Sequence, residues 1–391
     1  MTALSVDAQQ ARASTMPLYW MALGAFAIGT ESFMVAAILP AIAEDLHVRT
    51  EIAGQLVTAF ALTYAVSSPL LTALTGTLGR RRLLIGCMVA FAGANLLAAL
   101  STSYIALLTA RVLLAAAAGL YVPNANAIAI TLVSPDRRGR ALAIVTGGLS
   151  LAVTLGVPLG ALIGGHFGWR MTFAGVGLLS AVALIGLIVG VPKGIGAGYA
   201  PANLRDRLTA VASPGVVPVL VVTVLWAAGG FTVYTYLAVV LSQATELRTT
   251  GIGLALFGWG ASAFVGLVAG GRLTDRIGAH RVIAVALPIL ALALASLSVS
   301  SRLFSPDMAM IPMLVAIVVW GASAWGFFPA QQARLIGITG AASAPVILSL
   351  NASSQYAGFA IGAALGGIVL ADRSLTDLGW TGGYASWRPP C

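Results

Sequence analysis

One acid and one base lie inside long, otherwise uncharged apolar stretches of this chain. Glu31 lies within the stretch 18–39, and Arg111 lies within 104–133. A charged side chain inside a bilayer costs about 2.5 to 3.5 kcal/mol on insertion scales, so such residues usually face a cavity or a partner. Glu31 lies about 8 residues, or roughly 12 Å, from one end of its stretch, too deep for a short carboxylate to reach the surface. Such a carboxylate is a candidate for taking up and releasing protons.

Arg111 lies about 7 residues, or roughly 10 Å, from the end of its own stretch. Its depth is therefore similar to that of Glu31. An arginine side chain is long enough to reach a membrane surface, so helix packing is an alternative role for Arg111.

The composition indicates a membrane protein. Of the 391 residues, 59% are hydrophobic and 8% are charged, whereas a soluble domain has about 45 to 50% and about 25%. The net charge of +9 comes from basic residues in short loops, not from one face or arm, which excludes a nucleic-acid-binding protein. Three scattered histidines and two unpaired cysteines predict no metal site and no disulfide framework, and we expect no cofactor.

Uncharged runs of about 18 residues or more are long enough to cross a hydrocarbon core of about 30 Å. The first run is too long, and too promptly followed by others, to be a cleaved signal peptide. The pattern predicts an all-α polytopic fold with eleven spans, which are 18–39, 52–75, 83–100, 104–133, 141–165, 171–191, 214–241, 251–271, 282–300, 308–330 and 346–371.

The basic residues predict the orientation. With a cytoplasmic N-terminus, the inner loops carry thirteen basic residues and the outer loops carry five. This excess follows the positive-inside rule, so we expect a multi-pass inner-membrane protein with its N-terminus in the cytoplasm. The expected parts are a leader 1–17, a six-helix bundle 18–191, a linker 192–213, a five-span bundle 214–371 and a short tail 372–391.

Two internal patterns constrain the helix packing. Residues 74–82 align at an offset of 199 with residues 273–281, and each segment follows an even-numbered span. The halves are therefore expected to be parallel repeats that hold a substrate between them. In the fifth span, small residues recur along one helical face, which predicts close helix contact. These residues are Gly148, Gly156, Gly160 and Gly164, with Pro158 among them.

On these features the chain resembles the major facilitator superfamily. Within it, the chain is similar to bacterial drug:proton antiporters, a branch that includes exporters of sugars, nucleosides and chloramphenicol and the arabinose efflux permease type. The resemblance covers roughly residues 18 to 380. It is carried by the two inner-loop segments, the small residues of the fifth span, Arg111 with Gly119, and Gly29-Thr30-Glu31-Ser32-Phe33 running into Leu39-Pro40.

The resemblance implies the major facilitator fold, with two parallel six-helix repeats and alternating access, and we expect a monomer. In the family the first and fourth helices line the cavity, so Glu31 and Arg111 are expected to form an ion pair that couples protons to transport. The fifth span, including Pro158, resembles the family's antiporter signature and favours export. Side chains expected in the cavity, each of which could instead join helices, are Tyr121, Asn124, Asn126, Tyr234 and Trp325.

A cytoplasmic gate is also implied by the resemblance. Gly76 and Thr77 replace the Asp and Arg of the family motif, whereas the second copy keeps both residues. We therefore expect the gate to depend on the second half, with Asp275 bonded across the interface to Arg137, Arg138 or Arg140. The expected gate residues are Gly79, Arg80, Asp275, Arg276 and Gly278.

The family has twelve spans, and only 14 residues follow Asp377 here. Such a segment cannot cross a bilayer. We expect either eleven spans with the tail and Cys391 outside the cell, or a reading frame altered near Trp380.

Together these observations predict a proton-coupled exporter of small organic molecules of antibiotic type, with the substrate, protons and the lipid bilayer as its partners. An exporter of sugars or nucleosides is the nearest alternative. A non-transporting membrane sensor or an inactive truncated product is the alternative from another class. An enzyme is not expected, because no nucleophile, base and orienting acid occur together.

Overall fold

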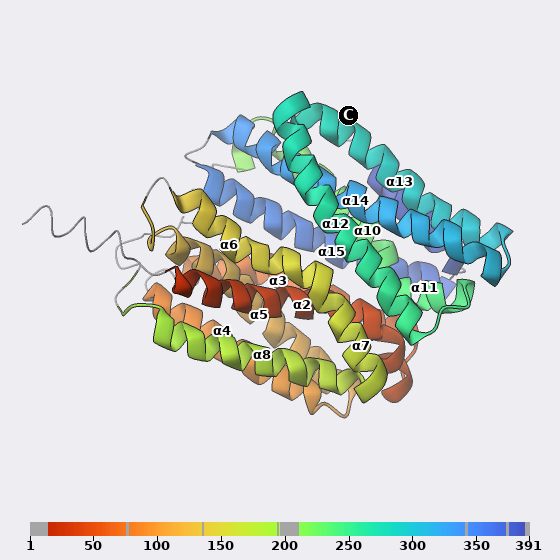
Figure 1. The fold of residues 1–391 in the computed structure, drawn as a ribbon, viewed down its shortest axis with the longest axis horizontal. Coiled ribbons are helices and arrows are strands. Elements are labelled where there is room, and N and C mark those ends of the chain that lie inside the picture. Colours follow the sequence, from red (N-terminus) through yellow and green to blue (C-terminus); the bar gives the residue numbers. More distant parts are fainter. Residues whose placement is uncertain are drawn as a thin grey trace, which may run out of the picture.

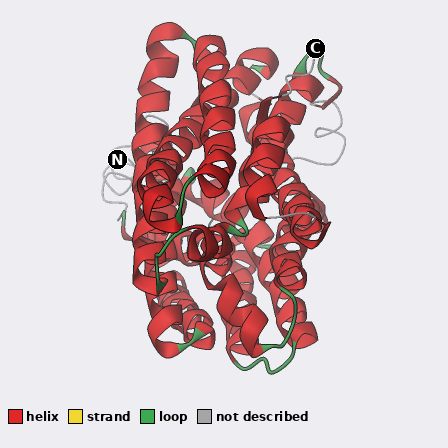
Figure 2. Ribbon diagram, turned by 90° about the vertical axis from the view of Figure 1, so that its right-hand side faces the viewer, coloured by secondary structure: helices red, strands yellow, loops and turns green. Residues whose placement is uncertain are grey.

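Helices form every regular element in the described part of this computed structural model, as Figure 2 shows. Most of the expected leader, most of the expected linker and Cys391 lie outside that part. The described residues are 15–75, 78–134, 137–193, 195, 211–340, 343–372 and 375–387.

The first half consists of long apolar helices joined by short turns. Ser103 caps one of them by accepting a hydrogen bond from the backbone N–H of Ala106 at 3.3 Å. Gly168 has φ +87°, a left-handed conformation that favours glycine, and it joins two helices directly. The elements are α2 (Met16–Asp45), α3 (Thr50–Leu74), α4 (Arg80–Ala99), α5 (Tyr104–Ala129), α6 (Arg138–Leu151), the π-helix η2 (Ala152–Gly156), α7 (Val157–Phe167) and α8 (Trp169–Gly190).

The second half repeats this plan. Its elements are α10 (Val216–Tyr234), α11 (Leu237–Ala244), α12 (Thr249–Ile277), α13 (Ala279–Leu303), α14 (Pro306–Thr339), α15 (Ala344–Asp372), the short 3-10 helix η4 (Leu375–Asp377) and α16 (Leu378–Trp387).

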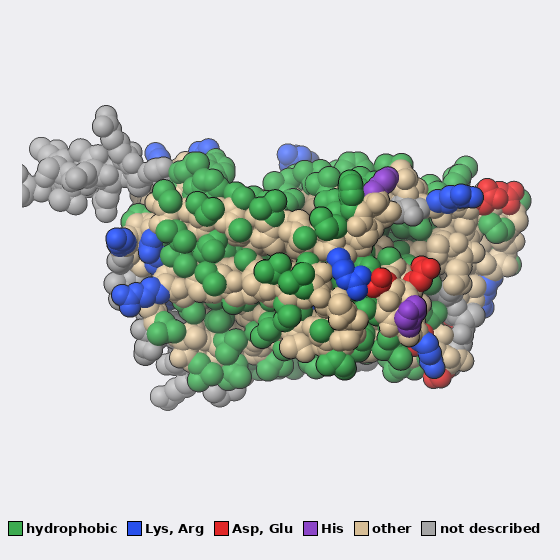
Figure 3. All heavy atoms as spheres, turned by 90° about the horizontal axis from the view of Figure 1, so that it is seen from below, with side chains coloured by type: hydrophobic (Ala, Val, Ile, Leu, Met, Phe, Trp, Pro, Cys, Tyr) green, Lys and Arg blue, Asp and Glu red, His purple; other side chains and the backbone are tan. Residues whose placement is uncertain are grey.

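Eleven helical segments among the described residues are long and apolar enough to cross a membrane, which confirms the predicted number of spans. Apolar side chains cover the middle of the face in Figure 3, and charged side chains gather towards its two ends. Large apolar side chains point outwards along the bundle, such as Val189, which is 81% exposed. This surface suits lipid, since apolar groups gain nothing by leaving a hydrocarbon solvent.

Three segments differ from simple spans. The fifth contains one π-turn, η2, between α6 and α7, and the seventh breaks after Tyr234. The expected tail 372–391 contains a ten-residue helix, α16, that packs on α10 and α13. Ten helical residues rise about 15 Å, too short to cross a bilayer but long enough to occupy a groove between two helices.

The two halves converge towards one end of the bundle. α3 packs along α15, and α12 packs on η2 and α7. In Figure 1, α12 meets α7 at the right and diverges from α6 towards the left. The end at which α4 and α6 begin and α12 ends is called the basic end below, and it carries Arg80, Arg138 and Arg276.

Candidate functional site

The most buried charged residues lie where α2 crosses the first half. Glu31 and Arg111 are both 0% exposed, and the Glu31 carboxylate forms an ion pair with the Arg111 guanidinium. The expected ion pair is therefore present. α2 brings the acid and α5 brings the base, because the two helices pack together within the first bundle.

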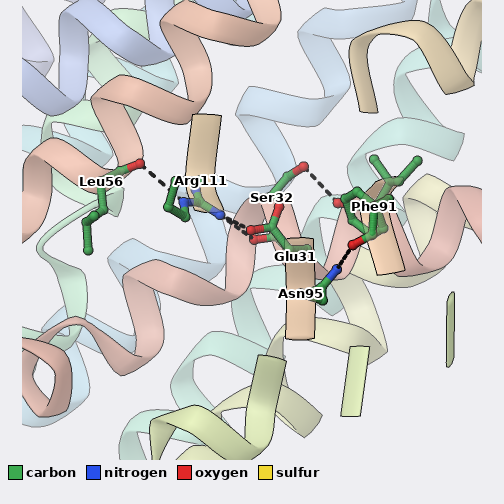
Figure 4. Close-up of polar contacts among 7 residues, drawn as sticks. Glu31, Ser32, Leu56, Phe91, Asn95 and Arg111 are labelled. Carbon is green, nitrogen blue, oxygen red and sulfur yellow. Dashed lines mark hydrogen bonds and ion pairs between the residues drawn. The ribbon is translucent and has the colours of Figure 1, made fainter. Parts of the chain in front are cut away.

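Arg111 is held by more than its ion pair. Its Nε donates to the backbone oxygen of Leu56 at 3.2 Å, and Nη1 donates to the backbone oxygen of Glu31 at 3.4 Å. Figure 4 shows the guanidinium between these partners. Its carbon Cζ also lies 4.2 Å from the centre of the Phe60 ring, a cation–π contact. The arginine is thus fixed from α2 and α3 at once.

The pair retains unused hydrogen-bonding capacity. Glu31 Oε2 and Arg111 Nη2 are buried and have no hydrogen-bond partner among the described residues. A carboxylate with a free oxygen can accept a proton without first breaking its contact to the arginine. Proton uptake would remove the charge attraction that holds the pair.

A small, partly open pocket lies mainly in the second half, between α10, α12, α14 and α15. Phe33 is two residues after Glu31 and brings α2 into its wall. Tyr234 donates to the backbone oxygen of Phe33 at 3.3 Å, and the rings of Phe231 and Phe359 stack with centroids 3.6 Å apart. The lining residues are Phe33, Trp226, Ala227, Gly230, Phe231, Tyr234, Trp259, Trp320, Ala324, Trp325 and Phe359.

Two of the five expected cavity residues, Tyr234 and Trp325, line this pocket. The other three, all on α5, do not. Tyr121 is fully buried in the first half and donates to the backbone oxygen of Met21 at 3.1 Å. Asn124 donates to the backbone oxygen of Leu120 at 2.7 Å, so it stabilises its own helix, and Asn126 is half-buried outside the pocket.

Sequence reasoning missed most of the pocket, including Phe33, Phe231 and Phe359. Apolar rings within apolar spans carry no distinguishing pattern, because either a lipid-facing or a buried position accepts them. The one usable signal was that Phe33 lies close to Glu31 on the same helix.

The expected gate residues lie at the basic end. Gly79 precedes α4 with φ −58°, whereas its repeat counterpart Gly278 has φ +86° and joins α12 directly to α13. Arg80 is half-buried, and Arg276 is exposed. Asp275 is exposed, and no ion pair between described residues includes it. The expected bond from Asp275 to an arginine near α6 is absent from this conformation, because α12 and α6 diverge at this end.

The small residues of the fifth span all face α2. A side-chain carbon added at Gly148, Gly156, Gly160 or Gly164 would meet Ala22, Thr30, Met34 and Ile38, respectively. Pro158 is buried at the start of α7, after the π-turn. Across the interface, the Thr154 hydroxyl of the π-turn donates to the backbone oxygen of Gly260 on α12 at 3.2 Å.

Known proteins are similar to this chain in sequence or in fold. The chloramphenicol resistance protein of Streptomyces lividans is 35% identical over 94% of this chain and 90% of its own. The inner membrane transport protein YdhP of Escherichia coli (strain K12) is 32% identical over 91% of this chain and 89% of its own. A crystal structure of peptide transporter POT superimposes with a TM-score of 0.79 at 14% identity, covering 95% of this chain and 91% of that one, which shows a common fold.

The family model described as Major Facilitator Superfamily matches residues 21–363. Members of this family are membrane transporters and not enzymes. The eleven spans, the common fold and the match along nearly the whole chain agree. This chain is therefore a multi-pass transporter of the inner membrane that belongs to the Major Facilitator Superfamily.

Proposed function

We propose that this chain exports small aromatic organic compounds in exchange for protons. The observation that carries the proposal is the Glu31–Arg111 ion pair, sealed from solvent and connected through α2 to an aromatic pocket. A buried acid that can change its charge provides a proton site, and the neighbouring pocket provides a substrate site. Coupling then requires only that proton and substrate bias the same conformational equilibrium.

The proposed cycle assigns each residue a step. Open to the outside, Glu31 takes up a proton and its attraction to Arg111 falls, while Arg111 keeps its contacts with Leu56 and Phe60. Open to the cytoplasm, substrate enters the aromatic pocket and favours release of that proton inwards. Phe33 links the two sites, because it lines the pocket two residues from Glu31. One proton enters for each substrate molecule exported.

The pocket favours an aromatic substrate. Eight of its eleven lining residues are aromatic, and none carries a formal charge. Flat rings gain dispersion and edge-to-face contacts in such a site. A sugar, with hydroxyls around its ring, would need many more polar partners than these side chains offer. The name of the Streptomyces lividans relative also fits an amphenicol-type compound for this chain.

The chain is proposed to work as a monomer with its N-terminus in the cytoplasm. We place the N-terminus in the cytoplasm, since that orientation puts the basic end on the inner side. A single chain supplies both halves of the interface, the proton site and the pocket. The monomer is therefore the proposed transporting unit.

Proton movement in everted membrane vesicles tests this function. Respiration acidifies the lumen and quenches a pH-sensitive dye, and a substrate of the antiporter then restores fluorescence. We expect chloramphenicol or another aromatic antibiotic to do so with the parent chain and Glu31→Gln to abolish the response. Glu44→Gln is the matched control, because Glu44 lies on the same helix but is exposed at its end.

Three outcomes would contradict the proposal. Dequenching that persists in Glu31→Gln would remove Glu31 from coupling. Dequenching by sugars or nucleosides alone would replace the substrate class. Failure of every compound, with the protein present in the membrane, would favour a non-transporting or inactive chain.

A further inference from the structure

Tyr356 joins the two halves next to the proton site. It lies on α15 in the second half, and its ring stacks on that of Tyr64 on α3, with centroids 3.7 Å apart and an interplanar angle of 16°. This contact lies within the long interface between α3 and α15. Any movement of one half against the other along this interface must shift or break the stack.

The same ring lies beside the ion pair. Phe60 lies one turn before Tyr64 on α3. The centroid of its ring is 6.5 Å from that of the Tyr356 ring and 4.2 Å from Arg111 Cζ. The Tyr356 hydroxyl lies close to the side chain of Ser32, which follows Glu31 in the chain and itself donates to the backbone oxygen of Ile28 at 2.7 Å. The charges of Glu31 and Arg111 both act on this hydroxyl.

Tyr356 also touches the wall of the aromatic pocket. Its ring lies edge-on to Phe359, one turn further along α15, with centroids 5.3 Å apart. Phe359 in turn stacks on Phe231 at 3.6 Å. One side chain of the second half thus contacts the substrate pocket, the inter-half interface and the surroundings of Glu31.

The ion pair has room for the partner that Tyr356 offers. Glu31 Oε2 and Arg111 Nη2 have no hydrogen-bond partner among the described residues. A phenol hydroxyl can donate to a carboxylate oxygen or accept from a guanidinium N–H. Leaving such buried groups unpaired costs free energy, so a hydrogen bond from the hydroxyl to either atom would stabilise the site.

Few other ionisable groups could interact with the Glu31 carboxylate in place of the Tyr356 hydroxyl. Arg111 is the charged group that acts on Glu31 directly, and Tyr64 and Tyr234 are the nearby phenols, the latter engaged on Phe33. Other titratable side chains on elements packed against α2 are Glu51, Tyr104, Tyr121, Arg138, Arg140, His166, Arg170, Arg272, Asp275 and Arg276.

We propose that Tyr356 is a positioning residue of the proton site, whose hydroxyl is the hydrogen-bonding group that the second half brings to the Glu31 carboxylate. Ionised Glu31 holds the hydroxyl and so holds the α3–α15 stack in place. Protonated Glu31 releases it and frees the second half to move. The inference rests on the proposed function, in that Glu31 exchanges a proton during transport.

Infrared difference spectroscopy tests this inference without a substrate. The full chain is reconstituted in lipid, and the protonated-carboxyl band that Glu31→Gln removes is followed between about pH 4 and pH 10. Tyr356→Phe keeps the stacked ring but deletes the hydroxyl. We expect its band midpoint to move upwards by about one pH unit, because the ionised carboxylate loses a hydrogen bond. Tyr64→Phe is the matched control and should leave the midpoint unchanged.

The infrared results separate this inference from the proposed function. Substrate-independent results decide it: an unchanged midpoint in Tyr356→Phe, or an equal shift in Tyr64→Phe, overturns the role of Tyr356 and leaves Glu31 as the proton site. Absence of a titrating band that depends on Glu31 overturns both proposals. In the vesicle assay with chloramphenicol, the pH profile of exchange in Tyr356→Phe should move in the same direction as its band midpoint.

Discussion

At the scale of single residues, burial of the Glu31–Arg111 pair carries an unfavourable desolvation free energy. Two charges are removed from water, and their attraction must offset that desolvation. Replacing both members with neutral residues is often harmless to stability, whereas removing one leaves an uncompensated charge. Arg111 also spreads its hydrogen bonds over two helices, which keeps it in place when Glu31 is neutral.

Removal of Arg111 alone should therefore destabilise the protein in a pH-dependent way. In Arg111→Gln, a carboxylate stays buried without its counter-charge, at a cost of about 3 to 5 kcal/mol when ionised. Proton uptake at low pH removes that cost. We expect the thermal unfolding midpoint in detergent to fall below the parent value much more at about pH 8 than at about pH 5.

The double variant Glu31→Gln/Arg111→Gln is the control, since it removes both charges. Its unfolding midpoint should lie closer to that of the parent and should lose the added pH dependence. Equal destabilisation of the single variant at both pH values would show that Arg111 contributes packing and not charge.

At the scale of elements, the fifth span is built to approach α2 closely. Its small residues repeat at the helical period and face residues with the same spacing on α2. The π-turn interrupts this helix, and its Thr154 reaches across to Gly260 on α12. The glycine face of the fifth span thus packs on α2 within the first half, while the π-turn contacts α12 of the second half.

A single methyl group at Gly156 should disturb this packing. In Gly156→Ala the new carbon would meet the Thr30 side chain, and overpacking of this kind costs about 1 to 3 kcal/mol. We expect a lower unfolding midpoint and reduced efflux in vesicles. Gly147→Ala is the matched control in the same span, because no atom lies within 4 Å of its added carbon. Comparable losses in both variants would show that contact with α2 is not the cause, because helix propensity alone would make both alanine variants more stable.

At the scale of the whole molecule, the halves pack along α3 and α15 and also meet at the end opposite to the basic end. α7 and η2 lie against α12 there, whereas α12 and α6 separate towards the basic end. Transport by alternating access requires this contact to open in another state. Fixing the contact should therefore arrest the cycle.

A disulfide between α7 and α12 provides that test. A side-chain carbon at Gly253 would lie 3.9 Å from Ala161 Cβ, a separation suited to a disulfide of about 3.5 to 4.5 Å between Cβ atoms. In a background with Cys87→Ser and Cys391→Ser, oxidised Ala161→Cys/Gly253→Cys should lose transport. Reductant should restore it, with the cross-link followed by gel mobility after cleavage in the linker.

Each single cysteine variant is the control for this lock and should transport under oxidising conditions. Full transport by the cross-linked protein would mean that α7 and α12 stay together through the cycle. The alternating movement would then have to occur elsewhere.

Sequence alone determined the features that follow from solvation. Long uncharged runs can be stable only in a bilayer, so the number of spans and the helical class could be read from hydropathy. The depth of Glu31 and Arg111 followed from the helical rise, and their types restricted them to a partner or a cavity. The repeat between residues 74–82 and 273–281 indicated two related halves.

Only the tertiary structure decided which faces meet. It turned Tyr121 into the first half and brought Phe33, Phe231 and Phe359 together around a pocket. It also left Asp275 exposed and placed Tyr356 against Tyr64. In apolar spans the hydrophobic pattern does not say which face is buried, because lipid and protein interior solvate the same side chains. Helix rotation and pairing therefore depend on shape and on a few polar contacts that become visible only after packing.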